Sequence, residues 1–389
     1  MSRIVEMRQY DFVVVGARCA GASTAMLLVR AGARVLVIDR QEYGSDRLST
    51  HALMRGAVMQ LNHWGVLEKL VNLGTPKIDC TTFHYGPESV PVKIKPEWGV
   101  DCLIAPRRTV LDKVLVDEAK NAGVEFRFGM VLTDLVRTDD GKICGIAARD
   151  RDANTVEIKT DMVIGADGRQ SQVARLVDAQ IYRQGQNSTG VVYGYYDDMA
   201  DHGSQWYFGE GTAAGTIPTN DGQTCVFVGV PASRFAETFR GDLPGGFMRI
   251  ARANSAALAD KLDSAQISGK LRGFAGCPGY FRQSHGEGWA LVGDAGYFKD
   301  PMTAHGITDA LRDAQLLANA LTGVGVSDLA LYQSWRDVLS AELFQITEEV
   351  ASFEWDIPRV QKLHHQLSET MKLECEHLAQ TMETQQLAA

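Results

Sequence analysis

Two glycines that follow a short β-branched run are the first residues with a chemical implication. Gly16 and Gly21 delimit the segment GARCAG, which stands between the apolar run DFVVV and a run of good helix formers. Gly16 would permit a sharp turn, and Gly21 would let the helix pack close to the sheet. The N–H groups and the positive dipole end of that helix would then face a pyrophosphate. The spacing therefore predicts a dinucleotide-binding turn.

A carboxylate and an arginine refine this prediction. Asp39 ends a second apolar run, RVLVID, at about the twenty-residue offset of the carboxylate that accepts hydrogen bonds from an adenosine ribose. Arg18 stands where the middle glycine of such a turn usually lets the backbone approach the phosphates. The Arg18 side chain must therefore point away from the ligand or join it.

Two later apolar runs also end in a glycine and a carboxylate. The run VIGADG ends at Asp167 and Gly168, and the run WALVGDA contains Gly293 and Asp294. A helix follows each run, and the second helix is expected to start near Gly306. All three segments therefore have a glycine at the end of an apolar run.

Aromatic and histidine side chains supply candidates for a substrate pocket. The strand-like runs from Gly190 to Pro231 are rich in aromatic residues. Such a face is most often plain core, but it becomes a pocket wall if one side of the sheet covers the cofactor. A helix is expected over the stretch from Leu53 to Leu67, and Ser49 or Thr50 in the loop before it could simply be its N-cap. The candidate catalytic residues are His51, Tyr193, Tyr195, Trp206 and His305, and His285 is a further pocket candidate.

The elements that must position these residues alternate between strand and helix. Proline-punctuated runs from Thr75 to Val100 and the aromatic runs interrupt this alternation and read as antiparallel strands. We expect an α/β fold with a Rossmann-like dinucleotide-binding domain, an interleaved antiparallel-sheet substrate domain and C-terminal helices broken at Pro358, which could form a lid, a brace or a dimer surface. The predicted bounds are 1–74, 101–178 and 275–325 for the first domain, 75–100 and 179–274 for the second, and 326–389 for the helices.

Composition narrows the class of protein. The 389 residues are 45% apolar and carry a net charge of −9, which argues against nucleic acid or an anionic membrane as partner. Seven cysteines without a C-x-x-C pair are typical of a reducing compartment and offer no zinc spacing, so no metal is expected. The start of the chain lacks the pattern of a signal peptide. We expect a soluble, cytoplasmic monomer or homodimer.

The three segments together resemble those of the FAD-dependent monooxygenases with the p-hydroxybenzoate hydroxylase fold, which geranylgeranyl reductases and flavin halogenases share. The resemblance covers the chain to about Leu321. It implies a glutathione-reductase-type FAD domain, in which the first segment binds the ADP half of FAD. The second segment, with Ser171 and Arg175, would lie between FAD and the nicotinamide cofactor, and the third would hold the ribityl chain. A late stretch from Phe353 to Pro358 is similar to a halogenase motif only by coincidence, because of its position.

The resemblance also assigns residues. The helix start near Gly306 would stabilise the negative charge of a reduced flavin. The predicted cofactor-binding residues are Gly16, Ala17, Arg18, Ala20, Gly21, Asp39, Arg40, Arg47, Arg108, Val131, Asp167, Gly168, Gly293, Asp294, Pro301, Gly306 and Ile307.

The activity implied by the resemblance is that of a monooxygenase with non-covalent FAD. NADPH or NADH and molecular oxygen would be co-substrates. A small organic substrate, aromatic or polycyclic, would be hydroxylated or epoxidised through a flavin hydroperoxide. Alternatives are an FAD-dependent reductase or dehydrogenase acting on carbon–carbon double bonds, a flavin halogenase, or a non-enzymatic redox flavoprotein.

Overall fold

A mainly parallel sheet forms one layer of the computed structural model, which describes residues 3–49, 51–199, 202–323 and 328–388. Its strands are β1 (Arg3–Val15), β2 (Val35–Asp39), β7 (Glu125–Phe128), β8 (Val131–Arg137), β9 (Ile143–Arg149), β10 (Thr155–Gly165), β18 (His285–Gly286) and β19 (Trp289–Leu291). The order is β18-β19-β10-β1-β2-β7, and β9 joins β8 to β10 by antiparallel pairing. Because β1 pairs in parallel with β2 and β10, and β10 with β19, the predicted nucleotide-binding turns meet at one edge of the sheet.

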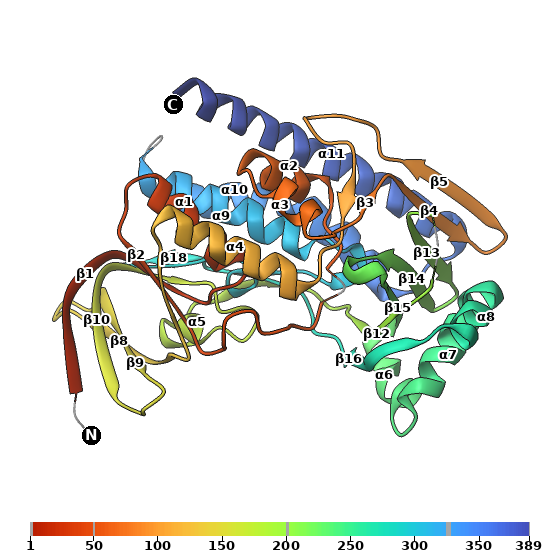
Figure 1. The fold of residues 1–389 in the computed structure, drawn as a ribbon, viewed down its shortest axis with the longest axis horizontal. Helices are drawn as coiled ribbons and strands as arrows, with labels where there is room; N and C mark the ends of the chain where they lie inside the picture. The colour runs from red at the N-terminus through yellow and green to blue at the C-terminus, as the bar shows by residue number, and fades with distance from the viewer. Residues whose placement is uncertain (1–2, 50, 200–201, 324–327, 389) are drawn as a thin grey trace.

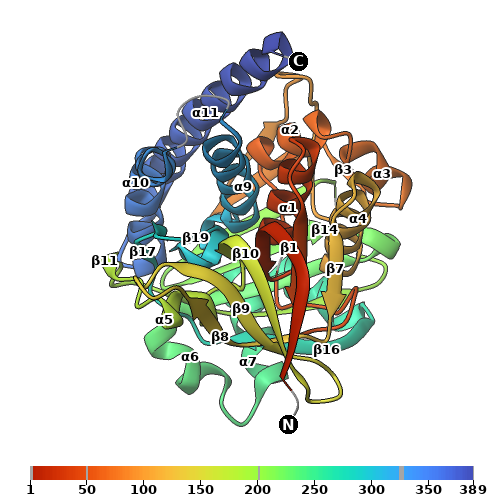
Figure 2. The ribbon, with the colours of Figure 1, turned by 90° about the vertical axis from the view of Figure 1, so that its left-hand side faces the viewer.

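Both faces of this sheet are buried, which explains why its strands are nearly continuous apolar runs. In β1, Val14 packs toward helices, whereas Val13 and Val15 pack against the layer that contains β8 and β9. The helices on the first face are α1 (Cys19–Arg30), α4 (Arg108–Ala122) and α9 (Gly306–Thr322), seen beside β1 and β10 in Figure 2. The predicted Rossmann-like α/β layer is confirmed.

A second sheet of seven strands stands at the other end of the molecule (Figure 1). Its strands are β4 (Cys80–Tyr85), β5 (Glu88–Lys93), β12 (Thr189–Tyr196), β13 (Ser204–Gly209), β14 (Thr212–Pro218), β15 (Thr224–Pro231) and β16 (Ile267–Phe274). The order is β16-β12-β15-β14-β13-β4-β5. The predicted antiparallel sheet is confirmed, with one parallel pair between β13 and β4. These two strands come from distant parts of the chain, so no hairpin forces them to be antiparallel.

Alternation along these strands gives the second sheet two different faces. Tyr193, Trp206 and Phe227 point to one face, and Val192 and Val228 point to the other. The latter is covered by α6 (Ala232–Phe239), α7 (Leu243–Asn254) and α8 (Ala256–Ser264). The aromatic face is left for the first layer and the C-terminal helices.

Short elements connect the two layers. They are α2 (Arg55–His63), α3 (Leu67–Asn72), β3 (Lys77–Ile78), β6 (Leu103–Ile104), α5 (Gln172–Leu176), β11 (Ile181–Gln184), the 3-10 turn η1 (Asn220–Gly222), β17 (Tyr280–Arg282), η2 (Gly293–Ala295), β20 (Tyr297–Phe298) and η3 (Pro301–Thr303). The interpretation of Ser49 as an N-cap is wrong, because Met54 occupies the N-cap position of α2. Thr50 lies outside the described residues.

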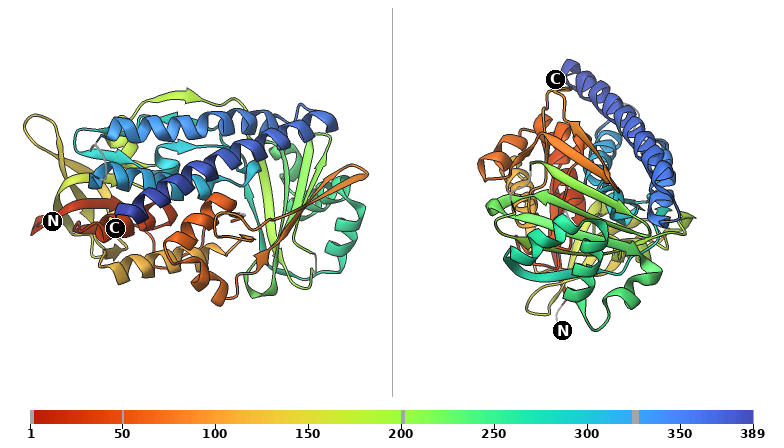
Figure 3. Two further views of the ribbon diagram at one scale, coloured as in Figure 1. Left: turned by 90° about the horizontal axis from the view of Figure 1, so that it is seen from above. Right: turned by 90° about the vertical axis from the view of Figure 1, so that its right-hand side faces the viewer.

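Two C-terminal helices, α10 (Leu329–Ser352) and α11 (Ile357–Ala388), run along one side of the molecule, and α11 crosses from the second sheet to the first layer (Figure 3). The break between them lies before Pro358, which belongs to the first turn of α11, where proline needs no hydrogen-bond partner. None of the helices among the described residues combines the length and apolar character needed to cross a bilayer.

Candidate functional site

A cavity of about 470 Å³ lies where the turns of the first layer face the aromatic side of the second sheet. It is lined at one end by the start of α1 and at the other by side chains of the second sheet, including Tyr193, Trp206 and Phe227. Of the seventeen predicted cofactor-binding residues, all but Ala17, Gly21 and Gly293 line it. The structure therefore brings together most of the residues that the sequence placed at the cofactor.

The turn before α1 requires its two glycines. Gly16 has φ +109°, and a β-carbon there would lie 2.4 Å from the carbonyl oxygen of Ala166. A β-carbon on Gly21 would lie 1.8 Å from the Gly16 oxygen. No side chain caps the start of α1, so its first N–H groups are left for a ligand.

Asp39 lies in the cavity wall and also orders the turn. Its carboxylate accepts hydrogen bonds from the backbone N–H groups of Ala17, at 2.8 Å, and Gln41, at 2.7 Å. Each carboxylate oxygen can accept more than one hydrogen bond, so a ribose hydroxyl can still be bound.

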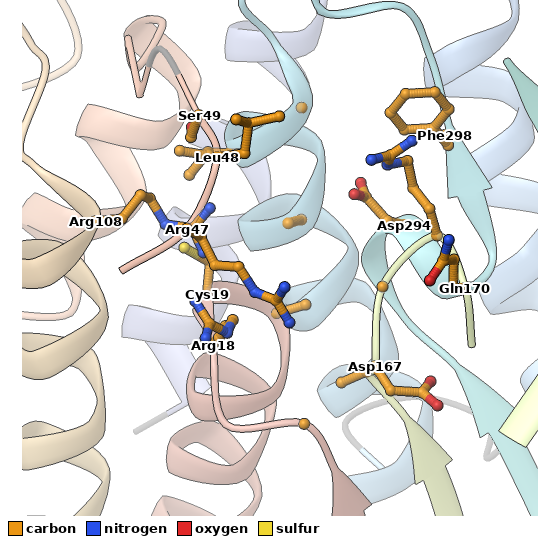
Figure 4. Close-up of a pocket in the computed structure, with 18 of the residues that line it drawn as sticks. Arg18, Cys19, Arg47, Leu48, Ser49, Arg108, Asp167, Gln170, Asp294 and Phe298 are labelled. Carbon is orange, nitrogen blue, oxygen red and sulfur yellow. The ribbon is translucent and has the colours of Figure 1, made fainter. Parts of the chain in front are cut away.

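Three arginines gather around the start of α1, across the cavity from Asp294 (Figure 4). Arg18 donates to Ser45 Oγ at 3.0 Å, and Arg108 donates to the Asp112 carboxylate at 3.0 Å. The Arg47 guanidinium has no ion pair or hydrogen bond with another described residue. Arg47 is therefore the cation of the three most available to an anionic ligand, while Arg18 is held toward Ser45.

Asp167 and Gly168 lie in the cavity wall. Figure 4 shows Asp167 on the other side of the cavity from the arginines. The Asp167 carboxylate accepts from Ser171 Oγ at 2.5 Å and from the N–H groups of Gln172 and Val173 at the start of α5. The Asp167 carboxylate therefore stabilises the turn before α5. Gly168 lies in the same turn and adopts φ +80°, which glycine tolerates.

Asp294 presents a half-buried carboxylate to the cavity. It accepts no hydrogen bond from another described residue, and burial raises its pKa to about 6, partly offset by Arg169 and Arg108. The start of α9 stands beside it, with Pro301, Gly306 and Ile307 in the wall and no side-chain cap on the helix. A ligand hydroxyl would supply the missing hydrogen bond to Asp294.

The candidate catalytic residues separate into two groups. His51, Tyr193 and Trp206 line the cavity, whereas Tyr195 and His305 do not, and neither does His285. His51 bonds the Ala105 carbonyl through Nδ1 at 3.1 Å and the Tyr195 hydroxyl through Nε2 at 3.0 Å. Burial and Arg107 lower the pKa of His51 to about 3, so it is neutral near pH 7. Tyr195 thus contacts two lining residues, His51 through its hydroxyl and Tyr193 through its ring, with ring centroids 5.8 Å apart.

His305 turns away from the cavity into a buried group of charges. Ligand atoms of His305, Asp309 and Glu374 lie within 4.8 Å of one another, a spacing that could hold a metal ion. Cations already bind these carboxylates, however, since Lys299 Nζ lies 2.8 Å from Asp309 and Arg312 Nη1 lies 2.7 Å from Glu374. The group is therefore an ion-pair cluster.

Some lining residues had no signal in the sequence. Arg169 lies over the rings of Phe274, at 4.5 Å, and Phe298, at 5.2 Å, in the cavity wall. Lys299 also lines the cavity. Arg169 follows the Asp167–Gly168 motif, and Lys299 precedes the proline loop that contains Pro301. Proximity to a motif was therefore the one signal that could have identified them.

The cavity fits FAD. The uncapped start of α1 and the Arg47 guanidinium suit a pyrophosphate, and the uncapped start of α9 suits an electron-rich ring. The carboxylate of Asp39 suits the ribose hydroxyls, and that of Asp294 suits the ribityl hydroxyls. The tight contact between Gly16 and Gly21 brings the backbone to where a phosphate would lie.

Comparison with known proteins agrees with this fit. Residues 9–330 match the model of the FAD binding domain. The chain is 24% identical over 321 residues to the digeranylgeranylglycerophospholipid reductase of Methanocella arvoryzae, covering 80% of this chain and 77% of that protein. The structure of the flavin-dependent brominase Bmp2 superposes with a TM-score of 0.77 at 18% identity, covering 96% of this chain and 93% of that one. The structure of pqsL, a probable FAD-dependent monooxygenase from Pseudomonas aeruginosa, gives 0.77 at 19%, with 92% and 100% covered. The chain therefore belongs to the family of FAD-binding-domain oxidoreductases.

Proposed function

We propose that this protein is an FAD-dependent monooxygenase that uses NADPH or NADH and molecular oxygen to hydroxylate or epoxidise a small aromatic or polycyclic compound. The observation that carries the proposal is the shape of the cavity. It runs from the cradle at α1, past the start of α9, to an aromatic wall of Tyr193, Trp206 and Phe227. A flat apolar molecule can therefore bind beside the redox centre.

FAD, held at the starts of α1 and α9, would supply the hydride and oxygen chemistry. The residues of this chain bind and orient the cofactor and the substrate, and they exclude water. The start of α9 stabilises negative charge beside Pro301 and Gly306, and the aromatic wall keeps water from the reacting atoms. The backbone N–H of Ser49 donates to the Tyr193 hydroxyl at 3.1 Å, which fixes that ring in the wall.

A reductase that acts on carbon–carbon double bonds is the alternative, favoured by the reductase among the relatives. A halogenase has less support. The one stretch with a similar motif serves packing here, because Trp355 donates to the Val350 carbonyl at 2.9 Å and packs against Phe208 and Phe353.

Labelled oxygen separates the two leading functions. The FAD-loaded protein would be given NADPH or NADH, ¹⁸O₂ and a panel of phenolic and polycyclic compounds, and each product would be weighed by mass spectrometry. We expect one ¹⁸O atom per turnover. Trp206→Ala should reduce this coupling, whereas Trp335→Ala, a change at an exposed tryptophan of α10, should not.

A saturated product formed without oxygen from an isoprenoid substrate would refute the monooxygenase proposal and establish the reductase. The panel should therefore contain an isoprenoid alcohol, assayed anaerobically in parallel.

A further inference from the structure

One buried carboxylate joins two of the arginines that gather at the start of α1. The Arg108 guanidinium donates to Asp112, one helical turn further along α4, through Nε at 3.2 Å and through Nη2 at 3.0 Å. The other oxygen of the same carboxylate, Oδ2, lies 3.5 Å from Arg18 Nη1. A guanidinium bound through one edge to a carboxylate is fixed in direction as well as in place.

The same carboxylate also contacts the helix that presents its free N–H groups to the cavity. Cys19 is the first residue of α1, and its Sγ donates to Asp112 Oδ1 at 3.1 Å. Asp112 therefore connects the start of α4 with the start of α1. It sets the position of Arg108 relative to the uncapped N–H groups of α1.

The charges at this place are not balanced. Burial lowers the pKa of Arg18, and the neighbouring cations Arg47 and Arg108 lower it further. Asp112 and, to a smaller extent, Asp39 raise it. Three guanidinium groups thus face two carboxylates, which leaves an excess of positive charge.

The arginines, and not the carboxylate, are open to the cavity. Arg18 and Arg108 line it, with 19% and 13% of their side chains exposed, whereas Asp112 does not line it. Arg108 Nη1, on the edge of the guanidinium away from Asp112, donates to no other described residue. Two N–H groups are therefore left for an anion.

We propose that Asp112 is a positioning residue for the pyrophosphate of FAD. It holds Arg108 so that the free Nη1 group meets the pyrophosphate beside the start of α1, and it offsets the repulsion between Arg108 and Arg18. Because the guanidinium is oriented before the ligand arrives, less conformational freedom is lost on binding. The proposal rests on FAD binding and not on oxygen transfer.

Positioning and simple charge attraction predict opposite effects when the Asp112 charge is removed. A carboxylate close to the site repels a pyrophosphate, so attraction alone predicts tighter FAD binding without it. Positioning predicts weaker binding, because Arg108 is then no longer oriented. The sign of the change in affinity therefore separates the two.

The test is the dissociation constant of FAD, measured by titrating the FAD-free protein with FAD and following the flavin fluorescence. Asp112→Asn should raise Kd by about tenfold, which is the effect of misaligning about one charge-assisted hydrogen bond to the ligand. In an Arg108→Met background, Asp112→Asn should leave Kd nearly unchanged, because the group that it positions is gone. A merely structural role would raise Kd by the same factor in both backgrounds.

The matched control is Asp139→Asn, which removes the same charge from an exposed position after β8 and should leave Kd unchanged. Unchanged or tighter FAD binding by Asp112→Asn would overturn the proposal, and so would an equal loss in both backgrounds. If Asp112→Asn does not fold, Asp112→Glu decides, because it keeps the charge but displaces the carboxylate. Weaker binding by that variant supports the proposal and wild-type affinity refutes it. These outcomes are independent of ¹⁸O incorporation.

Discussion

Asp294 shows how a binding residue destabilises the protein that carries it. Its carboxylate is half-buried and accepts no hydrogen bond from another described residue, and desolvation raises its pKa to about 6. The protonated form is therefore favoured more in the folded than in the unfolded protein, and the free energy of unfolding falls as pH rises from about 4 to about 6. FAD would relieve this by donating a ribityl hydroxyl.

Asp294→Asn should therefore stabilise the FAD-free protein and weaken FAD binding. A shift from 3.8 to about 6 corresponds to about 3 kcal/mol in the free energy of unfolding, fully present above pH 6 and absent below about pH 3.8. Thermal unfolding at pH 7.5 and pH 4, with FAD titration, measures both effects. An apo variant less stable than the wild type at pH 7.5 would contradict the assignment.

At the scale of elements, α11 acts as a brace between the layers. Near its start His364 bonds the Tyr85 hydroxyl at 2.7 Å and packs on Phe208 with ring centroids 4.4 Å apart. Further along, Glu374 reaches α9. Among a lid, a brace and a dimer surface, the contacts support the brace.

His364→Ala should cost about 2 kcal/mol in the free energy of unfolding at pH 7.5, from one hydrogen bond and an aromatic contact. Burial lowers the pKa of His364 to about 4, so the wild type loses stability as pH falls from about 6.5 toward 4. The cost of the substitution should therefore be close to zero at pH 5. Lys372→Ala, at an exposed position of α11, is the control, and urea denaturation at both pH values measures the difference. A cost that stays the same at pH 5 would show that His364 titrates normally.

At the scale of the whole molecule, the cofactor would lie between two layers that the chain visits alternately. Residues from before β4 and after β16 meet in one cavity, so FAD binding joins distant segments. Cys19 and His51 are the cysteine and histidine among its described lining residues. The Cys19 thiol bonds Asp112 at 3.1 Å, and burial raises its pKa, which keeps it a poor nucleophile.

FAD should therefore bind non-covalently and stabilise the whole fold. Acid precipitation should leave the flavin in the supernatant, as absorbance would show. The unfolding temperature should rise with FAD concentration, since a hundredfold excess over Kd adds about 2.7 kcal/mol. Flavin that stays with the precipitated chain would contradict the prediction.

The sequence by itself determined the α/β layer, the interleaved second sheet and the cofactor cradle. Gly16 could be recognised from the turn it permits, Gly21 from the close approach of helix and sheet, and Asp39 from its place at a strand end. All three are local properties, so the spacing of residues in the sequence is enough to predict them. The order of the three motifs then led to FAD.

Only the tertiary structure decided which side chains share the cavity and what each one contacts. Trp206 and Tyr195 have the same aromatic character in the sequence, yet packing places the first in the cavity and leaves the second outside it. His305 stands beside the recognised α9 start, but Glu374, sixty-nine residues later, helps to hold it in the buried cluster. Partners so distant along the chain meet through packing, and no local pattern records that pairing.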